Sequence, residues 1–303
     1  MAVLVSESAG TVTRLGAAKL EQELRAAFDA AGITAAISLV PGAQLRSAAE
    51  QALRQVQAGQ FDAVAAGGGD GSIRTVAGVL ADTGVALGIL PLGTLNHFAR
   101  DLAIPLDIGA AVAVMSTRAV RNVDIGTMNG EVFLNNSSIG LYPSLVLERE
   151  RQRRRQHLAK RSAMLLAILL MLRHLPLFRL SVRVEGLAES CRSPLVFIGN
   201  NDYQLTLPGL GKRARLDGGE LSVYVTKAQS RLALFRLACR AIFGLSQRLS
   251  DMRIVKGRTA SIETRRHHVL VAFDGEVELL RPPLHYEIRP RALRVFAPVR
   301  NDA

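Results

Sequence analysis

The sequence predicts an α/β N-terminal domain with a doubly wound parallel sheet and a C-terminal antiparallel β-sandwich domain with helical inserts. Up to about residue 125, strand patterns alternate with helix patterns, which indicates a parallel sheet. From about Leu177 onward, short strand patterns alternate with turns, as in antiparallel sandwiches. We therefore divide the chain into domains 1–124 and 125–303, and leave open whether the last strand packs back on the first domain.

Apolar spacing and chain breakers define the N-terminal elements. A helix through Leu24 and Phe28 stops at Gly32, and glycine also ends the next helix. The other predicted elements are strand Ala2–Ser6, strand Ile33–Leu39, helix Leu45–Ala58, strand Ala63–Ala66 and strand Val85–Leu90.

The C-terminal half begins with a hairpin signal, because two strand patterns, Val120–Ile125 and Val132–Ser138, flank Asn129-Gly130. Seven further strands are predicted from alternating apolar residues: Arg179–Glu185, Pro194–Gly199, Glu220–Thr226, Thr259–Thr264, His268–Phe273, Leu284–Ile288 and Leu293–Ala297.

Composition indicates a globular chain with a strong positive charge. The 303 residues include 38 Lys and Arg against 26 Asp and Glu, a formal net charge of +12. Such a charge favours anionic partners: nucleic acid, acidic lipid or phosphorylated substrates. Two distant cysteines, Cys191 and Cys239, fit a reducing cytoplasm and have no metal-ligand spacing. The N-terminus lacks a secretory pattern, and the longest apolar run, 163–172, is too short to span a bilayer.

The most informative motif lies at 61–72, where a short apolar run leads into Gly-Gly-Gly-Asp-Gly-Ser. Glycines allow several backbone N–H groups to point at one anion, and the helical pattern from Ile73 adds a positive helix N-terminus. Neither the Walker A spacing nor the dinucleotide fingerprint is present. A glycine-rich turn without ligand is the alternative, but Asp70 beside a phosphate indicates a Mg²⁺-bound nucleotide.

Two weaker motifs accompany this loop. The segment 91–100 (PLGTLNHFAR) begins where a parallel strand ends and offers Gly93, Thr94 and Asn96 to a nucleotide, although it also fits an ordinary turn. The segment 273–276 (FDGE) has two carboxylates beside an apolar strand, which suits a proton acceptor, although Asp-Gly is also a common hairpin turn.

Together, the segments 67–72, 91–100, 123–140 and 273–276 resemble the diacylglycerol kinase catalytic-domain family, bacterial lipid kinases related to sphingosine and ceramide kinases. The resemblance implies an N-terminal domain similar to that of NAD kinase, a β-sandwich bearing the lipid site, and an active site between the two. The implied reaction is ATP- and Mg²⁺-dependent transfer of the γ-phosphoryl group to a hydroxyl of a diacylglycerol-like lipid.

The same resemblance implies roles for individual residues. Asp70 belongs to the Mg²⁺ and phosphate network, and the proton acceptor is Glu276 or Asp274. The implied nucleotide-binding residues are Gly67, Gly68, Gly69, Gly71, Ser72, Thr94 and Asn96.

Three positions depart from the family pattern. The loop after the first strand reads Ser-Glu-Ser-Ala-Gly (6–10) where relatives often have Asn-Pro-x-x-Gly, and His97 stands where many have aspartate. In 216–221 (LDGGEL) a glycine replaces the aspartate that often holds a structural Mg²⁺, which leaves Asp217 as a weaker candidate ligand.

Two stretches, 149–172 and 231–250, interleave arginines with apolar residues and indicate contact with an anionic membrane surface. The predicted protein is therefore a cytoplasmic lipid kinase peripherally associated with membrane. One alternative is a soluble kinase similar to NAD kinase. Another is a non-catalytic basic protein that binds membrane or nucleic acid; four tyrosines and no tryptophan argue against nucleic acid. The lipid and the oligomeric state stay open.

Overall fold

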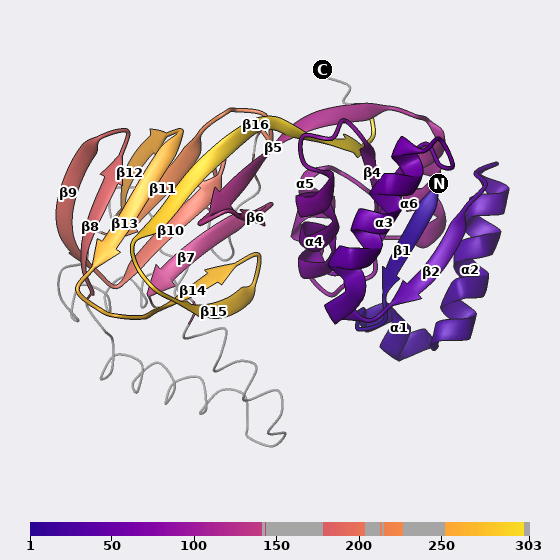
Figure 1. Ribbon diagram of the computed structural model, residues 1–303, viewed down its shortest axis with the longest axis horizontal. Helices are drawn as coiled ribbons and strands as arrows, with labels where there is room; N and C mark the ends of the chain where they lie inside the picture. Colours follow the sequence, from indigo (N-terminus) through magenta and orange to yellow (C-terminus); the bar gives the residue numbers. More distant parts are fainter. Residues whose placement is uncertain (141–142, 144–177, 204–212, 214, 227–251, 300–303) are drawn as a thin grey trace, which may run out of the picture. The chain divides into compact units, whose positions relative to one another are not determined.

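The computed structural model describes two compact units (Figure 1). Unit 1 comprises Met1–Ile125, Glu131–Asn135 and Arg289–Ala303, and unit 2 comprises Gly126–Gly130 and Asn136–Ile288. The described residues are 1–140, 143, 178–203, 213, 215–226 and 252–299.

The sheet of unit 1 is parallel, as the sequence predicts. Its order is β2 (Ala36–Val40), β1 (Ala2–Ser6), β3 (Val64–Gly68) and β4 (Ala86–Pro91). The end of β16 (Leu284–Phe296) adds a further parallel strand beside β4. Strands β1, β3 and β4 are buried throughout, because helices cover both faces of the sheet.

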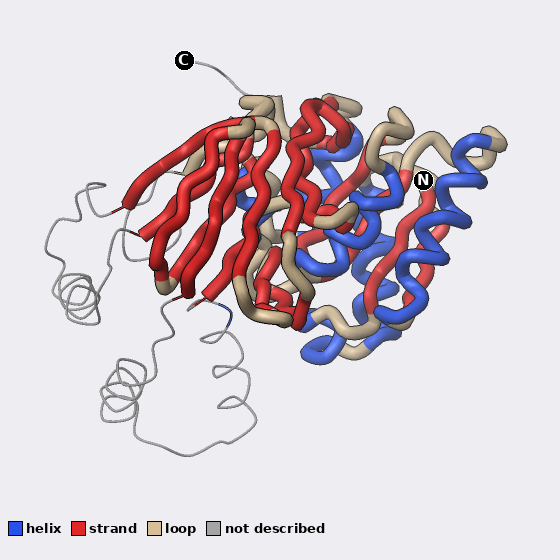
Figure 2. Tube along the Cα trace, turned by 60° about the vertical axis from the view of Figure 1, so that its left-hand side comes forward, coloured by secondary structure: helices blue, strands red, loops and turns tan. Residues whose placement is uncertain are grey.

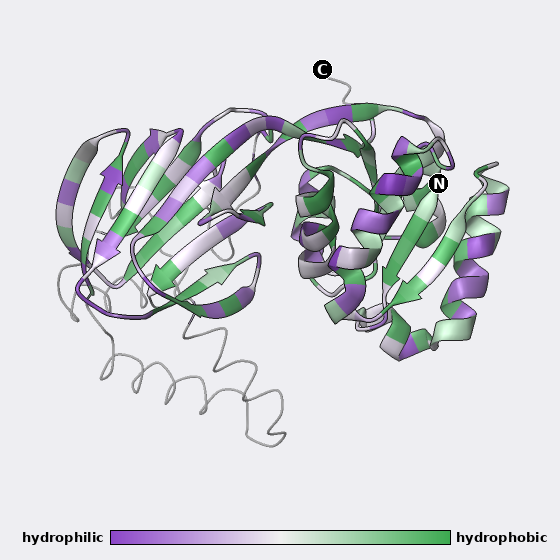
Figure 3. Cartoon of the chain, in the orientation of Figure 1, coloured by the Kyte–Doolittle hydropathy of each residue, from purple (hydrophilic) through white to green (hydrophobic). Residues whose placement is uncertain are grey.

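Amphipathic helices provide this cover. Helices α3 (Leu45–Gln57) and α4 (Asp70–Leu80) pack together and contact β1, β3 and β4, whereas α2 (Ala17–Ala30) packs with α6 (Ile108–Ser116). In Figure 3 the strands β1 and β2 are mostly green, whereas these helices carry purple, hydrophilic residues. The remaining elements of unit 1 are α1 (Gly10–Leu15), η1 (Gly42–Gln44), α5 (His97–Asp101), the first part of β5 (Val120–Met128) and β6 (Glu131–Phe133).

Unit 2 is a sandwich of two antiparallel sheets, whose strands lie side by side in Figure 2. One sheet has the order β9 (Leu187–Ser193), β8 (Phe178–Val184), β13 (Thr259–Thr264) and the first part of β16. The other has the order β12 (Met252–Gly257), β11 (Leu221–Thr226), β10 (Leu195–Asn200), β7 (Asn136–Gly140), β14 (Val269–Phe273) and β15 (Glu276–Leu280). The predicted fold class is confirmed for both units.

The sequence-based strands differ from the structure in three main respects. The single strand predicted at Val132–Ser138 is divided into two strands, β6 and β7. Three strands, β9, β12 and β15, were not predicted, and each lies at the edge of its sheet, where one side of the strand meets solvent. The two strands predicted at 284–288 and 293–297 form one strand, β16. Its Pro290 lies next to Arg291, which has a left-handed backbone (φ 54°) and donates its N–H to the Asp124 carboxylate at 2.7 Å.

Candidate functional site

The glycine-rich loop lies at the carboxyl edge of the parallel sheet in unit 1. Strand β3 ends at Gly68, and α4 begins at Asp70 with Gly69 as its N-cap. Because glycine has no side chain, Gly69 cannot cap the first amides of α4, and these amides carry the positive end of the helix dipole. Residues 69–72 are half-buried, so an anion can reach them from solvent.

Close packing explains two of these glycines. A Cβ on Gly67 would lie 3.1 Å from Leu92 and 3.1 Å from Val5. A Cβ on Gly68 would lie 2.5 Å from the Cβ of Ser72. Positive φ angles are recorded at other glycines and at neither of these two, so absence of side-chain volume, rather than left-handed backbone, is what these positions require.

The loop after β4 packs directly against the glycine-rich loop. A Cβ on Gly93 would overlap the Cα of Gly69. Asn96 has a left-handed backbone (φ 50°), and its side chain is buried inside the turn. Its Oδ1 accepts the Gly93 N–H at 3.1 Å, and its Nδ2 donates to the carbonyls of Pro91 at 3.2 Å and Gly93 at 3.0 Å. Asn96 therefore shapes the turn, whereas Thr94 is exposed.

Asp70 joins the two loops. Its Oδ2 accepts the backbone N–H of His97 at 3.1 Å, and its Oδ1 accepts that of Phe98 at 3.0 Å. The carboxylate therefore stabilises the first amides of α5, and both its oxygens have a backbone donor. Such hydrogen bonds to an ionised acceptor are stronger than neutral ones. Asp70 has a positioning role between the loops, whatever else it contacts.

The loop after β1 completes this edge. Thr11 donates both its N–H and its hydroxyl to the Leu92 carbonyl, at 3.1 and 3.0 Å. The buried hydroxyl of Ser6 lies 2.9 Å from that of Ser8. Thr11 was not among the residues predicted from the sequence. It lies five residues after the end of the buried strand β1, at the second position of α1, and this place is the only signal that could have found it. The loops after β1, β3 and β4 thus form one connected surface.

The predicted proton acceptors lie on the hairpin between β14 and β15 in unit 2. Asp274 (φ 50°) and Gly275 (φ 88°) form its two-residue turn. The Asp274 carboxylate accepts the Asn136 N–H at 3.2 Å, and its own N–H donates to the Asn136 carbonyl at 3.0 Å. Asp274 therefore fixes the hairpin to β7, whereas Glu276 is exposed at the first position of β15.

Asp217 lies in the loop before β11. Its carboxylate accepts from Arg215 at 3.2 Å, and the next amide, that of Gly218, donates to the Asn201 side chain at 2.8 Å. Within the part of the chain that the structure describes, no group of three His, Cys, Asp or Glu side chains could hold a metal ion. A metal at Asp217 stays a prediction that no observation supports.

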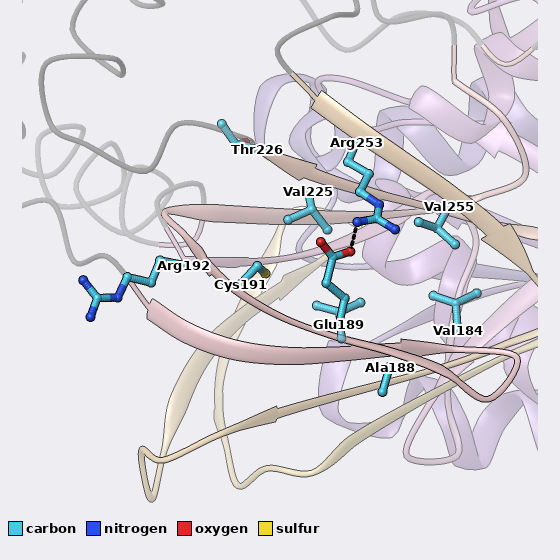
Figure 4. Close-up of a pocket in the computed structure, with 10 residues that line it drawn as sticks. Val184, Ala188, Glu189, Cys191, Arg192, Val225, Thr226, Arg253 and Val255 are labelled. Atoms are coloured by element: carbon cyan, nitrogen blue, oxygen red, sulfur yellow. Dashed lines mark ion pairs between the residues drawn. The ribbon is translucent and has the colours of Figure 1, made fainter.

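A pocket of about 270 Å³ opens between the two sheets of unit 2 (Figure 4). Val184 on β8, Val225 on β11 and Val255 on β12 line it, and Glu189 pairs with Arg253 from the opposite sheet. The pocket is mainly apolar, with one charged pair across it. The predicted membrane-binding stretches 149–172 and 231–250 lie outside the described residues. None of the helices formed by the described residues has the length and apolar character needed to cross a bilayer.

Sequence comparison decides the family. The diacylglycerol kinase catalytic domain matches residues 1–128, and the C-terminal NAD kinase β-sandwich-like domain named after YegS matches residues 147–297. The chain belongs to the diacylglycerol kinase catalytic-domain family. The two domain matches together cover nearly the whole chain, and they agree with the parallel sheet of unit 1 and the antiparallel sheets of unit 2.

Relatives within the family carry the names of lipid kinases. A probable YegS-like lipid kinase of Pseudomonas aeruginosa is 46% identical over 94 residues, 30% of this chain and 31% of that protein. The diacylglycerol kinase of Bacillus subtilis is 39% identical over 110 residues, 35% of each protein. The alignments thus span about a third of these relatives' length. The crystal structure of a putative diacylglycerol kinase from Bacillus anthracis has the same fold, with a TM-score of 0.69 at 23% identity over 98% of this chain and 96% of that one.

Proposed function

We propose that this protein is an ATP-dependent lipid kinase that transfers the γ-phosphoryl group to a hydroxyl of a diacylglycerol-like membrane lipid. The observation that carries this proposal is the surface at the carboxyl edge of the unit 1 sheet. There the uncapped start of α4 lies half-buried beside a second loop, and Asp70 locks the two loops together. Backbone amides at a helix N-terminus are a ready-made phosphate site.

In this proposal the amides of residues 69–72 and the Ser72 hydroxyl bind the phosphates of ATP, and exposed Thr94 contacts the nucleotide from the second loop. Gly67 and Gly68 allow the close packing that places these amides, and Asn96 shapes the turn that carries Thr94. Fixed donors of this kind stabilise charge on a transferring phosphoryl group without reorganising during the reaction.

Mg²⁺ fits this arrangement as an ion that arrives with the nucleotide. Mg²⁺ usually keeps phosphate oxygens and water as ligands and takes only one or two carboxylates. Asp70 is the carboxylate of this loop, and an oxygen that accepts one N–H retains a second lone pair. The ion would neutralise negative charge on the phosphates, while Asp70 holds the two loops in place.

For the proton of the lipid hydroxyl, we propose a carboxylate of the hairpin at 273–276. Glu276→Gln is expected to lower kcat by about 10²–10⁴-fold and to leave ATP affinity unchanged, because a positioned base contributes about that much. Glu278→Gln is the matched control, since Glu278 is also exposed on β15 and its side chain lies on the same face.

Asp274→Asn distinguishes the two candidates. Its carboxylate holds the Asn136 amide, so we expect a lower melting temperature together with a smaller loss of kcat than in Glu276→Gln. Single-turnover transfer from labelled ATP and thermal unfolding measure the two effects. A large loss of kcat in Asp274→Asn with an unchanged melting temperature would assign the base to Asp274 instead.

We also propose that the apolar pocket of unit 2 accepts part of the lipid's apolar body. Val225→Trp would fill much of the 270 Å³ between the sheets. We expect KM for a long-chain diacylglycerol to rise at least about tenfold, while ATP affinity stays constant, because only apolar burial is lost. Kinetics in mixed micelles measure this; equal KM values for the variant and the wild type would exclude the pocket.

The assay that tests the proposed function offers labelled ATP and Mg²⁺ with several acceptors. Vesicles contain diacylglycerol, phosphatidylglycerol or a sphingoid base, and NAD is offered in solution. We expect a labelled lipid on thin-layer separation and no labelled NAD. Transfer to NAD alone would favour the kinase of soluble substrates, and no transfer to any acceptor would contradict the enzyme proposal.

We propose in addition that the protein binds the cytoplasmic face of a membrane through the stretches 149–172 and 231–250.

A further inference from the structure

An arginine row crosses the outer face of one sheet in unit 2. Arg179 on β8 pairs directly opposite Arg192 on β9. Thr264 at the end of β13 pairs with Leu180, so the next residue, Arg265, follows at the level of Arg179. All three side chains are exposed, and they line one open hollow of about 660 Å³. We call Arg179, Arg192 and Arg265 the arginine row.

This row opposes local stability. Like charges directly across two strands destabilise a sheet. Arginines on edge strands often protect against aggregation, but Arg179 lies on β8, which has a neighbour on each side. Among the described residues, no ion pair is recorded for these three arginines, and the nearby Glu189 is already paired with Arg253. Figure 4 shows Arg192 extending away from the pocket between the sheets.

The row lies at the end of unit 2 where two predicted membrane-binding stretches join the described chain. Phe178, the first described residue after 149–172, pairs with Ser193, and the Ser193 hydroxyl donates to the Thr226 carbonyl at 3.2 Å. Thr226 precedes the stretch 231–250 and pairs with Met252, which follows it. Because Arg179 follows Phe178 and Arg192 precedes Ser193, the row lies next to the points where both stretches join the described chain.

A further cation lies at the same end. The Arg266 guanidinium lies 4.4 Å from the centre of the Phe178 ring, which is an energetically favourable cation–π distance. Two acidic residues, Glu189 and Glu263, line the hollow. Among the described residues, an ion pair is recorded for Glu189, with Arg253, and none for Glu263. The hollow therefore has a net positive charge and suits a surface with closely spaced phosphates.

We propose that the arginine row docks unit 2 on a membrane rich in anionic phospholipid, with the guanidinium groups on headgroup phosphates. Guanidinium groups bind phosphate through paired N–H donors, and cations near an anionic leaflet add binding energy roughly in proportion to their number. This inference deepens the proposed function and rests on it, because a membrane substrate is what gives docking on a membrane its biological purpose. In this proposal, residues outside both basic stretches determine which side of unit 2 faces the membrane.

The test is sedimentation with vesicles of phosphatidylcholine alone or mixed with phosphatidylglycerol, without ATP. The triple variant Arg179→Gln, Arg192→Gln, Arg265→Gln is expected to bind the mixed vesicles on the order of 100-fold more weakly than wild type. The control Lys19→Gln, Arg54→Gln, Arg258→Gln removes the same charge from exposed positions elsewhere and is expected to bind within about threefold of wild type. The triple lysine variant of the row is expected to keep most of the binding.

Equal losses in the row variant and the control would overturn the proposal, because only net charge would then matter. A row variant that keeps vesicle binding but loses binding to a single-stranded oligonucleotide would also overturn it. The row variant is expected to bind ATP as wild type does and to unfold at the wild-type temperature or above it, because like-charge repulsion is removed. Both results show that the variant is folded. Because the vesicle assay contains no ATP, absence of phosphoryl transfer in wild-type protein would count against the proposed function alone.

Discussion

Replacing Asp70 by alanine is expected to lower kcat/KM by about 10²–10⁴-fold, because two charge-assisted hydrogen bonds, each worth about 1.5–3 kcal/mol, are lost together. The amides of His97 and Phe98 lose their acceptor, and the two loops lose the side chain that joins them. Vesicle binding should stay unchanged, since Asp70 lies in unit 1 and the basic surfaces do not include it. Steady-state kinetics and vesicle sedimentation measure the two effects.

Asp107→Ala is the matched control for this variant. Asp107 also accepts a backbone N–H at a helix start, that of Ala110 at 2.9 Å, but it caps α6. Its loss should cost about 1 kcal/mol of stability and leave turnover nearly unchanged. ATP affinity of Asp70→Ala measured without Mg²⁺ separates the positioning role of Asp70 from its role in the Mg²⁺ and phosphate network. The positioning role predicts a loss of affinity even when no metal is present. Wild-type turnover in Asp70→Ala would contradict our interpretation of the loop.

Gly93→Ala is expected to weaken the contact between the two loops. The added Cβ would overlap the Cα of Gly69 and lie 2.8 Å from the Oδ1 of Asn96, which is itself held in the turn, so there is little room to adjust. Overpacking of this kind costs about 1–3 kcal/mol, so we expect a lower melting temperature and ATP binding weakened by about 10–100-fold as the loops separate. Calorimetric titration with ATP and thermal unfolding measure both.

Gly69→Ala provides the steric comparison on the facing residue. Its Cβ would lie 3.7 Å from the Gly93 Cα, an ordinary contact, and its backbone (φ −84°) is accessible to alanine. We expect ATP affinity within about threefold of wild type. Equal effects of the two substitutions would show that the contact between these loops does not control nucleotide binding.

The buried parts of the fold were predictable from the sequence because burial gives a strong pattern. Strands β1, β3 and β4 have helices on both faces and read as continuous apolar runs. Strands β9, β12 and β15 were missed because edge strands keep polar and charged residues, such as the exposed Glu276 and Arg253. The kink at Pro290 looks like a strand end in sequence, but Asp124 accepts the following amide, so β16 continues.

The candidate site was predictable in residue type but not in contacts. The glycine pattern and Asp70 were recognisable, but the partners of Asp70 lie 27 and 28 residues away, and only the fold brings them together. Asn96 was predicted to hold the nucleotide, whereas its recorded contacts lie inside the turn. Sequence alone cannot separate these roles, since a polar side chain in a loop suits a ligand and a turn equally.

The most direct test of the account is nuclear magnetic resonance of the labelled backbone amides of residues 67–72 during titration with ATP and Mg²⁺. If these amides hold the triphosphate, their resonances should shift and saturate with ATP, should respond to inorganic triphosphate, and should barely change with adenosine. Unchanged resonances in this loop at ATP concentrations that saturate binding elsewhere would contradict the central claim.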